Sequence, residues 1–314
     1  MRVIIRPGDL RLPLETPELF GRQNPLVIEV GFGDGHYLAH LARSHPEWNL
    51  LGVEVSLGSL WRAYRRVLRN EISNVRLFRG DARFIVRDVI AENTLSRIYV
   101  KFPDPWPRKK HRKRRLLRAP FFSLLSTRLE DGGVLSFTTD HAEYFDFALE
   151  EAESTGYYQI TTGEPPVAAL ETKYARKWRE MNKEIFHAEF KKTAQAASHP
   201  ALIQKTDMHH AILEGDLSSI GSFEKQVHAF KGGHVIVLEG FRELSGDSMI
   251  FKVRVEEPDL VQEILIQAWQ KTDGVFVSLQ PFGDPLSTRG VREAVHAVTD
   301  WLATQGLVVK EKWI

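Results

Sequence analysis

Short apolar segments alternate with amphipathic segments along the first half of the chain. Segments rich in Val, Ile and Leu, typical of buried strands, occupy residues 25–31, 49–55, 75–79, 96–102 and 132–140. Helical periodicity follows them at residues 34–43, 57–70, 83–91, from about 118, and at 141–154. Strands that alternate with helices in this way predict an α/β fold. We expect a doubly wound, mostly parallel, Rossmann-like sheet covered on both faces.

A second pattern occupies the last third of the chain. Strands are expected at residues 234–241, 248–257, 275–279 and 307–313. Helices are expected at residues 258–271 and 287–305. This order predicts a smaller C-terminal α+β domain, ferredoxin-like in the order of its elements.

Charge divides the chain at a similar place. Residues 1–192 carry 31 Lys and Arg against 25 Asp and Glu, a net charge of +6, whereas residues 193–314 carry 11 against 16, a net charge of −5. The segment KKTAQAAS at 191–198, followed by His199-Pro200, is the expected linker. We therefore predict a basic functional domain over residues 1–192 and an acidic extension over residues 193–314.

Glycines or an acid follow every predicted strand of the first domain. The residues concerned are Gly31, Gly33, Gly35, Glu54, Asp81, Asp104 and Asp140. In an open doubly wound sheet, the carboxyl ends of the strands form the ligand crevice. We therefore expect these residues to gather at one edge of the sheet and to bind a ligand there.

The glycine loop indicates which ligand. The loop Gly31–Gly35 lets the backbone approach a ligand closely, but its third glycine comes too early for the dinucleotide fingerprint G-x-G-x-x-G. Glu29 and Asp34 disfavour a pyrophosphate there and favour S-adenosylmethionine (SAM), which is positively charged. Glu54 is placed to accept hydrogen bonds from ribose hydroxyls. For Asp81, a contact to adenine and a helix N-cap remain equally open.

Residues 102–115, FPDPWPRKKHRKRR, form the most specific segment. Two prolines hold the chain extended around Asp104, and Trp106 offers a flat face on which a base or a ribose can stack. Between Arg108 and Arg118 there are eight Lys and Arg and no acid. A run of one sign favours contact with a phosphate backbone over a merely solvated helix.

This segment resembles the signature of bacterial tRNA (guanine-N7-)-methyltransferases. Similar motifs occur in the family's order: IEVGFGDG at 28–35, GVEV at 52–55, GDA at 80–82, TTD at 138–140 and TKYARKW at 172–178. The resemblance covers roughly residues 1–190, and longer members of the family carry a C-terminal extension.

The resemblance implies a SAM-dependent methyltransferase that acts on tRNA. It implies cofactor contacts at Glu29, Glu54, Asp81 and Asp104, beside the loop glycines Gly31 and Gly33. It implies substrate contacts at Arg108, Asp140, Thr172, Lys173 and Tyr174. The target implied is a guanine in the variable loop. Because methylation at N7 moves positive charge onto the base, a nearby carboxylate would stabilise the change, and we assign this catalytic role to Asp104.

The composition agrees with methylation of a ring nitrogen. The chain has no cysteine, which excludes disulfides, thiolate zinc sites and a cysteine nucleophile. Guanine N7 carries an in-plane lone pair and attacks a methyl group without first losing a proton. His209-His210 lacks further ligands at metal spacing, so no metal site is expected.

Other functions remain open on the sequence alone. They are a nicotinamide-dependent oxidoreductase, a DNA or RNA amino-methyltransferase, and a non-catalytic tRNA-binding protein. The last is suggested by Ala175, where the family usually has glutamate. The chain shows neither a membrane-spanning run nor a signal-peptide pattern, so we expect a cytoplasmic protein. The sequence does not distinguish a monomer from a homodimer.

Overall fold

The computed structural model describes residues 2–168, 184–203, 206, 209–244 and 246–313. The chain divides into two compact units, one of residues 1–5 and 11–201 and the other of residues 6–10 and 202–314. The expected linker therefore lies within the first unit. The Ala196 amide donates to Ser126 Oγ (3.0 Å), and the buried Arg128 guanidinium donates to the His199 carbonyl (2.8 Å). Small polar residues suggested a linker, but these hydrogen bonds hold the segment in place.

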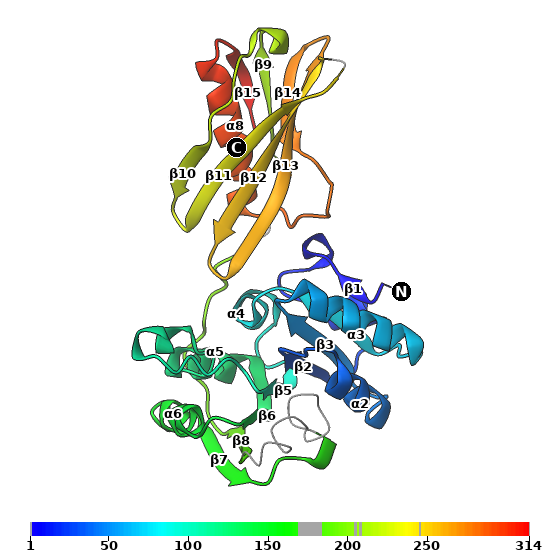
Figure 1. Cartoon of the computed structure of the whole chain (residues 1–314), viewed down its shortest axis with the longest axis vertical. Helices are drawn as coiled ribbons and strands as arrows, with labels where there is room; N and C mark the ends of the chain where they lie inside the picture. Colours follow the sequence, from blue (N-terminus) through cyan, green and yellow to red (C-terminus); the bar gives the residue numbers. More distant parts are fainter. Residues whose placement is uncertain (1, 169–183, 204–205, 207–208, 245, 314) are drawn as a thin grey trace. The chain divides into compact units, whose positions relative to one another are not determined.

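The first unit is built on an eight-stranded sheet in the order β1-β4-β3-β2-β5-β6-β8-β7 (Figure 1). Its strands are β1 Ile4–Ile5, β2 Leu26–Val30, β3 Asn49–Glu54, β4 Val75–Arg79, β5 Leu95–Lys101, β6 Leu129–Thr139, β7 Tyr158–Gly163 and β8 Phe186–Lys192. Pairing is parallel from β1 to β6, whereas β8 and β7 join antiparallel. The predicted doubly wound, mostly parallel sheet is confirmed; the two antiparallel strands were not foreseen.

Helices connect these strands. They are α1 Thr16–Phe20, α2 His36–Ser44, α3 Leu57–Arg69, α4 Ala82–Phe84, α5 Ala119–Arg128 and α6 Ala142–Glu153, with a π-helical turn at Ile85–Val89 and 3₁₀ turns at Pro7–Asp9 and Lys109–Arg114. Figure 1 shows α2 and α3 on one side of the sheet and α5 and α6 on the other. The chain order reverses beside β2, whose neighbours are β3 and β5. Such a reversal opens a crevice at the carboxyl ends of the strands.

The second unit is a seven-stranded antiparallel sheet in the order β10-β11-β12-β13-β14-β9-β15. Its strands are β9 His210–Glu214, β10 Gln226–Phe230, β11 Gly233–Arg242, β12 Ser248–Glu257, β13 Leu260–Lys271, β14 Gly274–Leu279 and β15 Val308–Lys312. A 3₁₀ turn covers Leu217–Ser219, and the helix α8, Arg289–Thr304, packs on the sheet (Figure 1). This unit is α+β, with its core between helix and sheet.

The helix predicted at residues 258–271 is wrong, because these residues form strand β13 after a tight turn. Asp259 occupies the left-handed region (φ +56°) that reverses the chain from β12. Leu260, Ile264 and Ile266 are buried, whereas Val261 and Glu263 between them are exposed. That alternation is the period of a strand. The ferredoxin-like order is therefore also wrong, because β12, β13 and β14 pair consecutively as an antiparallel meander.

Helices of the described residues are all too short or too polar to cross a bilayer. The same residues contain no group of three or more His, Asp or Glu side chains placed to hold a metal ion.

Candidate functional site

Two adjoining pockets open at the carboxyl ends of the parallel strands, and Gly31 lines both. The first, called here the Asp104 pocket, is lined by residues that include Glu54, Asp81, Arg83, Asp104, Trp106 and Arg114. The second, called the Lys101 pocket, is lined by residues that include Glu29, Asp34, Tyr37, Ser59, Arg62 and Lys101. Together they form a two-part crevice around the glycine loop between β2 and α2.

The glycine loop takes a path that other residues rarely adopt. Gly31, Gly33 and Gly35 all have positive φ, at +69°, +58° and +72°. A Cβ on Gly31 or Gly33 would meet nothing within 4 Å, so the backbone there faces open space. A Cβ on Gly35 would lie 2.6 Å from the Cβ of Ala63 in α3. The first two glycines thus leave room for a ligand, whereas the third lets α2 start against α3.

Glu54 and Asp81 both line the Asp104 pocket, and both already accept backbone hydrogen bonds. Glu54 accepts from the amides of Gly33 (3.1 Å) and Ser56 (2.9 Å). Asp81 caps α4 by accepting from the Arg83 amide (2.7 Å). The helix-cap interpretation of Asp81 is therefore confirmed, and the cap holds its carboxylate at the pocket wall. These bonds fix the direction of both carboxylates without burying them.

Asp104 is exposed in this pocket, between two residues with unusual backbone angles. Phe102 and Trp106 have φ of +48° and +43°, a conformation that costs about 1–3 kcal/mol per residue outside glycine. The buried Arg115 guanidinium donates from Nε to the Pro105 carbonyl (2.8 Å) and holds this turn in place. The segment therefore presents the Asp104 carboxylate to the pocket at the expense of local backbone strain.

The basic run from Arg108 to Arg118 contains both buried and exposed side chains. Arg115 is buried, pairs with Glu143 and contacts the Tyr144 ring, so it does not reach a solvent-exposed phosphate. The guanidinium of Arg114 lies over the Trp106 ring, 4.9 Å from its centroid. Lys109, Lys110 and Lys113 are exposed. The prediction of a phosphate contact thus fits these lysines, and it is wrong for Arg115.

Lys101 was missed by the sequence analysis. The residues Lys101 and Glu29 are 8% and 2% exposed, and Lys101 Nζ lies 3.2 Å from Glu29 Oε1. Burial lowers the pKa of Lys101 to about 8, although Glu29 opposes the shift. Burial also raises the pKa of Glu29, against the influence of Lys101. The available signal was a lysine at the carboxyl end of a predicted strand, directly before the Asp104 segment.

The ion pair leads to a prediction about stability and pH. Glu29→Gln is expected to lower the free energy of unfolding by about 3 kcal/mol at pH 6, because it leaves Lys101 charged and unpaired in the interior. The loss should be smaller at pH 9. In the folded chain, Lys101 loses its proton as pH rises through its lowered pKa, whereas in the unfolded chain it keeps the proton to a higher pH. The penalty for burying an unpaired charge therefore diminishes as pH rises through the folded-state pKa.

Urea unfolding of wild type and variant at both pH values measures this difference. The matched control is Glu18→Gln, which removes a carboxylate paired with Arg11 at the surface (2.8 Å) and should change stability by less than about 1 kcal/mol. An equal loss in Glu29→Gln at pH 6 and pH 9 would contradict the proposed ionisation of Lys101.

Some predicted site residues lie outside the two pockets. Arg108 precedes the exposed 3₁₀ turn at Lys109–Arg114, and Asp140 follows β6; neither is among the lining residues. Thr172, Lys173 and Tyr174 lie outside the described residues, as does Ala175.

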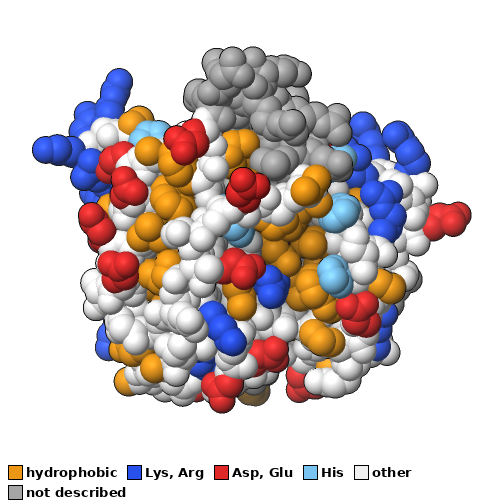
Figure 2. Space-filling view, turned by 90° about the horizontal axis from the view of Figure 1, so that it is seen from below, with side chains coloured by type: hydrophobic (Ala, Val, Ile, Leu, Met, Phe, Trp, Pro, Cys, Tyr) orange, Lys and Arg blue, Asp and Glu red, His pale blue; other side chains and the backbone are white. Residues whose placement is uncertain are grey.

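Figure 2 shows one face of the molecule, on which acidic, basic and apolar side chains are interspersed and Lys and Arg gather toward the margins.

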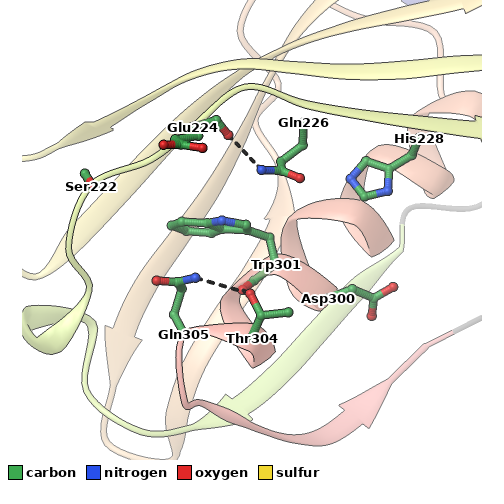
Figure 3. A pocket seen from close by; sticks show the side chains of 8 residues that line it. All are labelled: Ser222, Glu224, Gln226, His228, Asp300, Trp301, Thr304 and Gln305. Atoms are coloured by element: carbon green, nitrogen blue, oxygen red, sulfur yellow. Dashed lines mark hydrogen bonds between the residues drawn. The ribbon is translucent and has the colours of Figure 1, made fainter.

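The second unit has a pocket of its own beside β10 and α8 (Figure 3). The indole of Trp301 lies between the side chains of Glu224 and Gln226 on one side and those of Thr304 and Gln305 on the other. Trp301 also packs against Phe223 and Phe251, with ring centroids 5.0 and 5.5 Å apart. This tryptophan is therefore part of the core of the unit, and no predicted site residue lies here.

Comparison with known proteins finds a matching family model and relatives that align over nearly the whole chain. Residues 23–188 match a family model described as "Putative methyltransferase". The chain is 46% identical to the tRNA (guanine-N(7)-)-methyltransferase of Thermus thermophilus, over 98% of each chain. It is 40% identical to the enzyme of that name from Deinococcus radiodurans, over 99% of each chain, and 32% identical to that from Thermotoga maritima, over 94% of this chain and 95% of the relative.

Proposed function

The chain belongs to the tRNA (guanine-N(7)-)-methyltransferase family, and from that premise we propose that it methylates N7 of a guanine in the variable loop of tRNA, with SAM as methyl donor. The observation that supports this most directly is the two-part crevice at the strand ends, with the exposed Asp104 carboxylate at its wall. Since its substrate is tRNA, we also place the protein in the cytoplasm.

The crevice fits SAM in both of its parts. Glu54 and Asp81, held at the wall of the Asp104 pocket, would take the ribose and the adenine. Glu29 and the open backbone at Gly31 and Gly33 would take the amino-acid end. Bound SAM supplies an electrophilic methyl group on a positively charged sulfur. Carboxylates in both pockets suit a ligand with that charge better than they suit a dinucleotide.

Asp104 is the residue we assign to the transfer itself. Methylation at N7 places positive charge on the guanine, and a nearby carboxylate stabilises that change. The same carboxylate can accept the N1–H and amino protons of guanine, which would orient N7 toward the methyl group. N7 is inaccessible in the deep groove of an A-form helix. A guanine in a loop, or in a tertiary pair that can open, therefore fits this site better than one in a stem.

The exposed lysines of the basic run lead to a prediction about tRNA affinity. Replacing Lys109, Lys110 and Lys113 by alanine should weaken binding and make the dependence of log K on log salt concentration less steep by about 2 units, because three phosphate contacts are lost. The matched control replaces Lys225, Lys231 and Lys310 of the second unit by alanine, with the same change in net charge. Filter binding at several salt concentrations measures both slopes. Equal slopes in the two variants would refute the phosphate-binding role.

The methyl-transfer reaction itself tests the proposal. The purified full-length chain is incubated with methyl-labelled SAM and unmodified tRNA transcript, and the labelled nucleoside is identified. We expect label in 7-methylguanosine, and none when the variable-loop guanine is replaced. Label in another nucleoside would refute N7 specificity, and tRNA binding without label would identify a non-catalytic binding protein.

A further inference from the structure

The Lys101 pocket is lined by the ion pair of Lys101 and Glu29, in which Lys101 has no assigned role in methyl transfer. Both side chains are more than nine-tenths buried. Within the described residues, Lys101 Nζ and Glu29 Oε2 have no hydrogen-bond partner, although Nζ lies 3.2 Å from Glu29 Oε1. A buried polar atom without a hydrogen bond destabilises the folded chain, because its bonds to water are lost and not replaced. Two such atoms side by side at a pocket indicate that a ligand satisfies them.

The surroundings of Lys101 make it a strong anion site. Its Nζ lies 3.1 Å from the centroid of the Tyr37 ring and 4.9 Å from that of Tyr99. These rings exclude water from the ammonium, and a charge-assisted hydrogen bond is stronger in such a medium than in water. Arg62 also lines the pocket, but it is exposed and donates to Ser59 Oγ (2.8 Å). Arg62 is therefore the weaker competitor for an anion in this pocket.

The position of the pocket indicates what the anion belongs to. Gly31 lines both pockets, so a ligand whose nucleoside occupies the Asp104 pocket extends past Gly31 into the Lys101 pocket. At its far end, SAM carries an ammonium and a carboxylate on the same carbon. Adjacent charges of both signs on the ligand match the adjacent Lys101 and Glu29 on the protein.

We propose that Lys101 binds the carboxylate at the amino-acid end of SAM while Glu29 binds the ammonium, so that Lys101 selects a nucleoside ligand that carries a carboxylate. This inference rests on the proposed function, because it takes SAM as the ligand. Lys101 and Asp104 therefore have different roles. Lys101 contributes to affinity for the cofactor and does not contact the methyl acceptor.

Calorimetric titration without tRNA tests this assignment, with three probes that share the same nucleoside. SAM carries both charged groups, decarboxylated SAM carries only the ammonium, and 5′-methylthioadenosine carries neither. Wild-type protein should bind SAM at least about 30-fold more tightly than decarboxylated SAM. In Lys101→Met this preference should fall to within about threefold, and binding of 5′-methylthioadenosine should be unchanged, which shows that the nucleoside pocket is intact.

The control is Arg62→Met, which removes the other cation of the pocket and should keep the preference for SAM. If Lys101→Met keeps the preference, or if Arg62→Met alone loses it, the assignment to Lys101 is overturned. If Lys101→Met does not fold, Glu29→Gln/Lys101→Met removes both buried charges and should show the same loss of preference. Retained preference in that double variant overturns the assignment too.

Failure of the proposed function gives a different result. If wild-type protein binds 5′-methylthioadenosine and both SAM forms equally, the cofactor site is correct and only the role of Lys101 is wrong. If it binds none of the three probes, SAM is not its ligand and both proposals are overturned.

Discussion

Asp104→Ala is expected to slow methyl transfer by roughly 100- to 10,000-fold, the range found when a group that stabilises developing charge or handles a proton is removed. The side chain is exposed in its pocket. The turn that presents it is held instead by Arg115, which donates to the Pro105 carbonyl. Alanine at position 104 should therefore leave the fold nearly unchanged.

Single-turnover rates with saturating SAM and tRNA measure the transfer step, and thermal unfolding measures stability. Asp140→Ala is the matched control, because it removes a strand-end carboxylate outside both pockets. We expect it to affect tRNA affinity more than the transfer step. A rate for Asp104→Ala within threefold of wild type would remove Asp104 from the reaction.

Gly35→Ala is expected to lower the free energy of unfolding by about 2–5 kcal/mol. A residue with a Cβ loses about 1–2 kcal/mol in the left-handed region, and the close approach to Ala63 adds about 1–3 kcal/mol of overpacking. Gly33→Ala has a similar backbone angle but meets nothing within 4 Å. It should lose only about 1–2 kcal/mol.

Comparison of the urea unfolding midpoints of the two variants separates the effect of the contact with Ala63 from the effect of backbone strain, which both variants share. SAM affinity should change in the opposite order, because Gly33 lines the Lys101 pocket whereas Gly35 packs against α3. Equal losses of stability in Gly33→Ala and Gly35→Ala would show that the contact with α3 contributes nothing measurable.

The strand-end residues were predictable because of a geometric rule. Parallel strands that alternate with helices bring all their carboxyl ends to one edge, so Glu54, Asp81 and Asp104 meet although they are far apart in sequence. The pairing of residues across the sheet follows no such rule. Lys101 meets Glu29 because β5 lies beside β2, and strand order of this kind is set by the packing of the whole domain.

Two other errors have local causes. Residues 258–271 contain apolar positions that fit both a helical and a strand period, and pairing with β12 and β14 selected the strand. In the basic run, Arg115 is chemically the same as its exposed neighbours. Only the position of Glu143 and the aromatic rings of α6 shows that it faces inward.

The positive φ angles of Phe102 and Trp106 limit how this protein can be made more heat-resistant. Glycine or asparagine adopts such angles with less strain, so selection for thermal stability alone would favour replacing these aromatic residues. Trp106 lines the Asp104 pocket, however, and Phe102 lines the Lys101 pocket. Stability and activity are therefore opposed at these two positions, and a search for robust variants has to assay methyl transfer in every round.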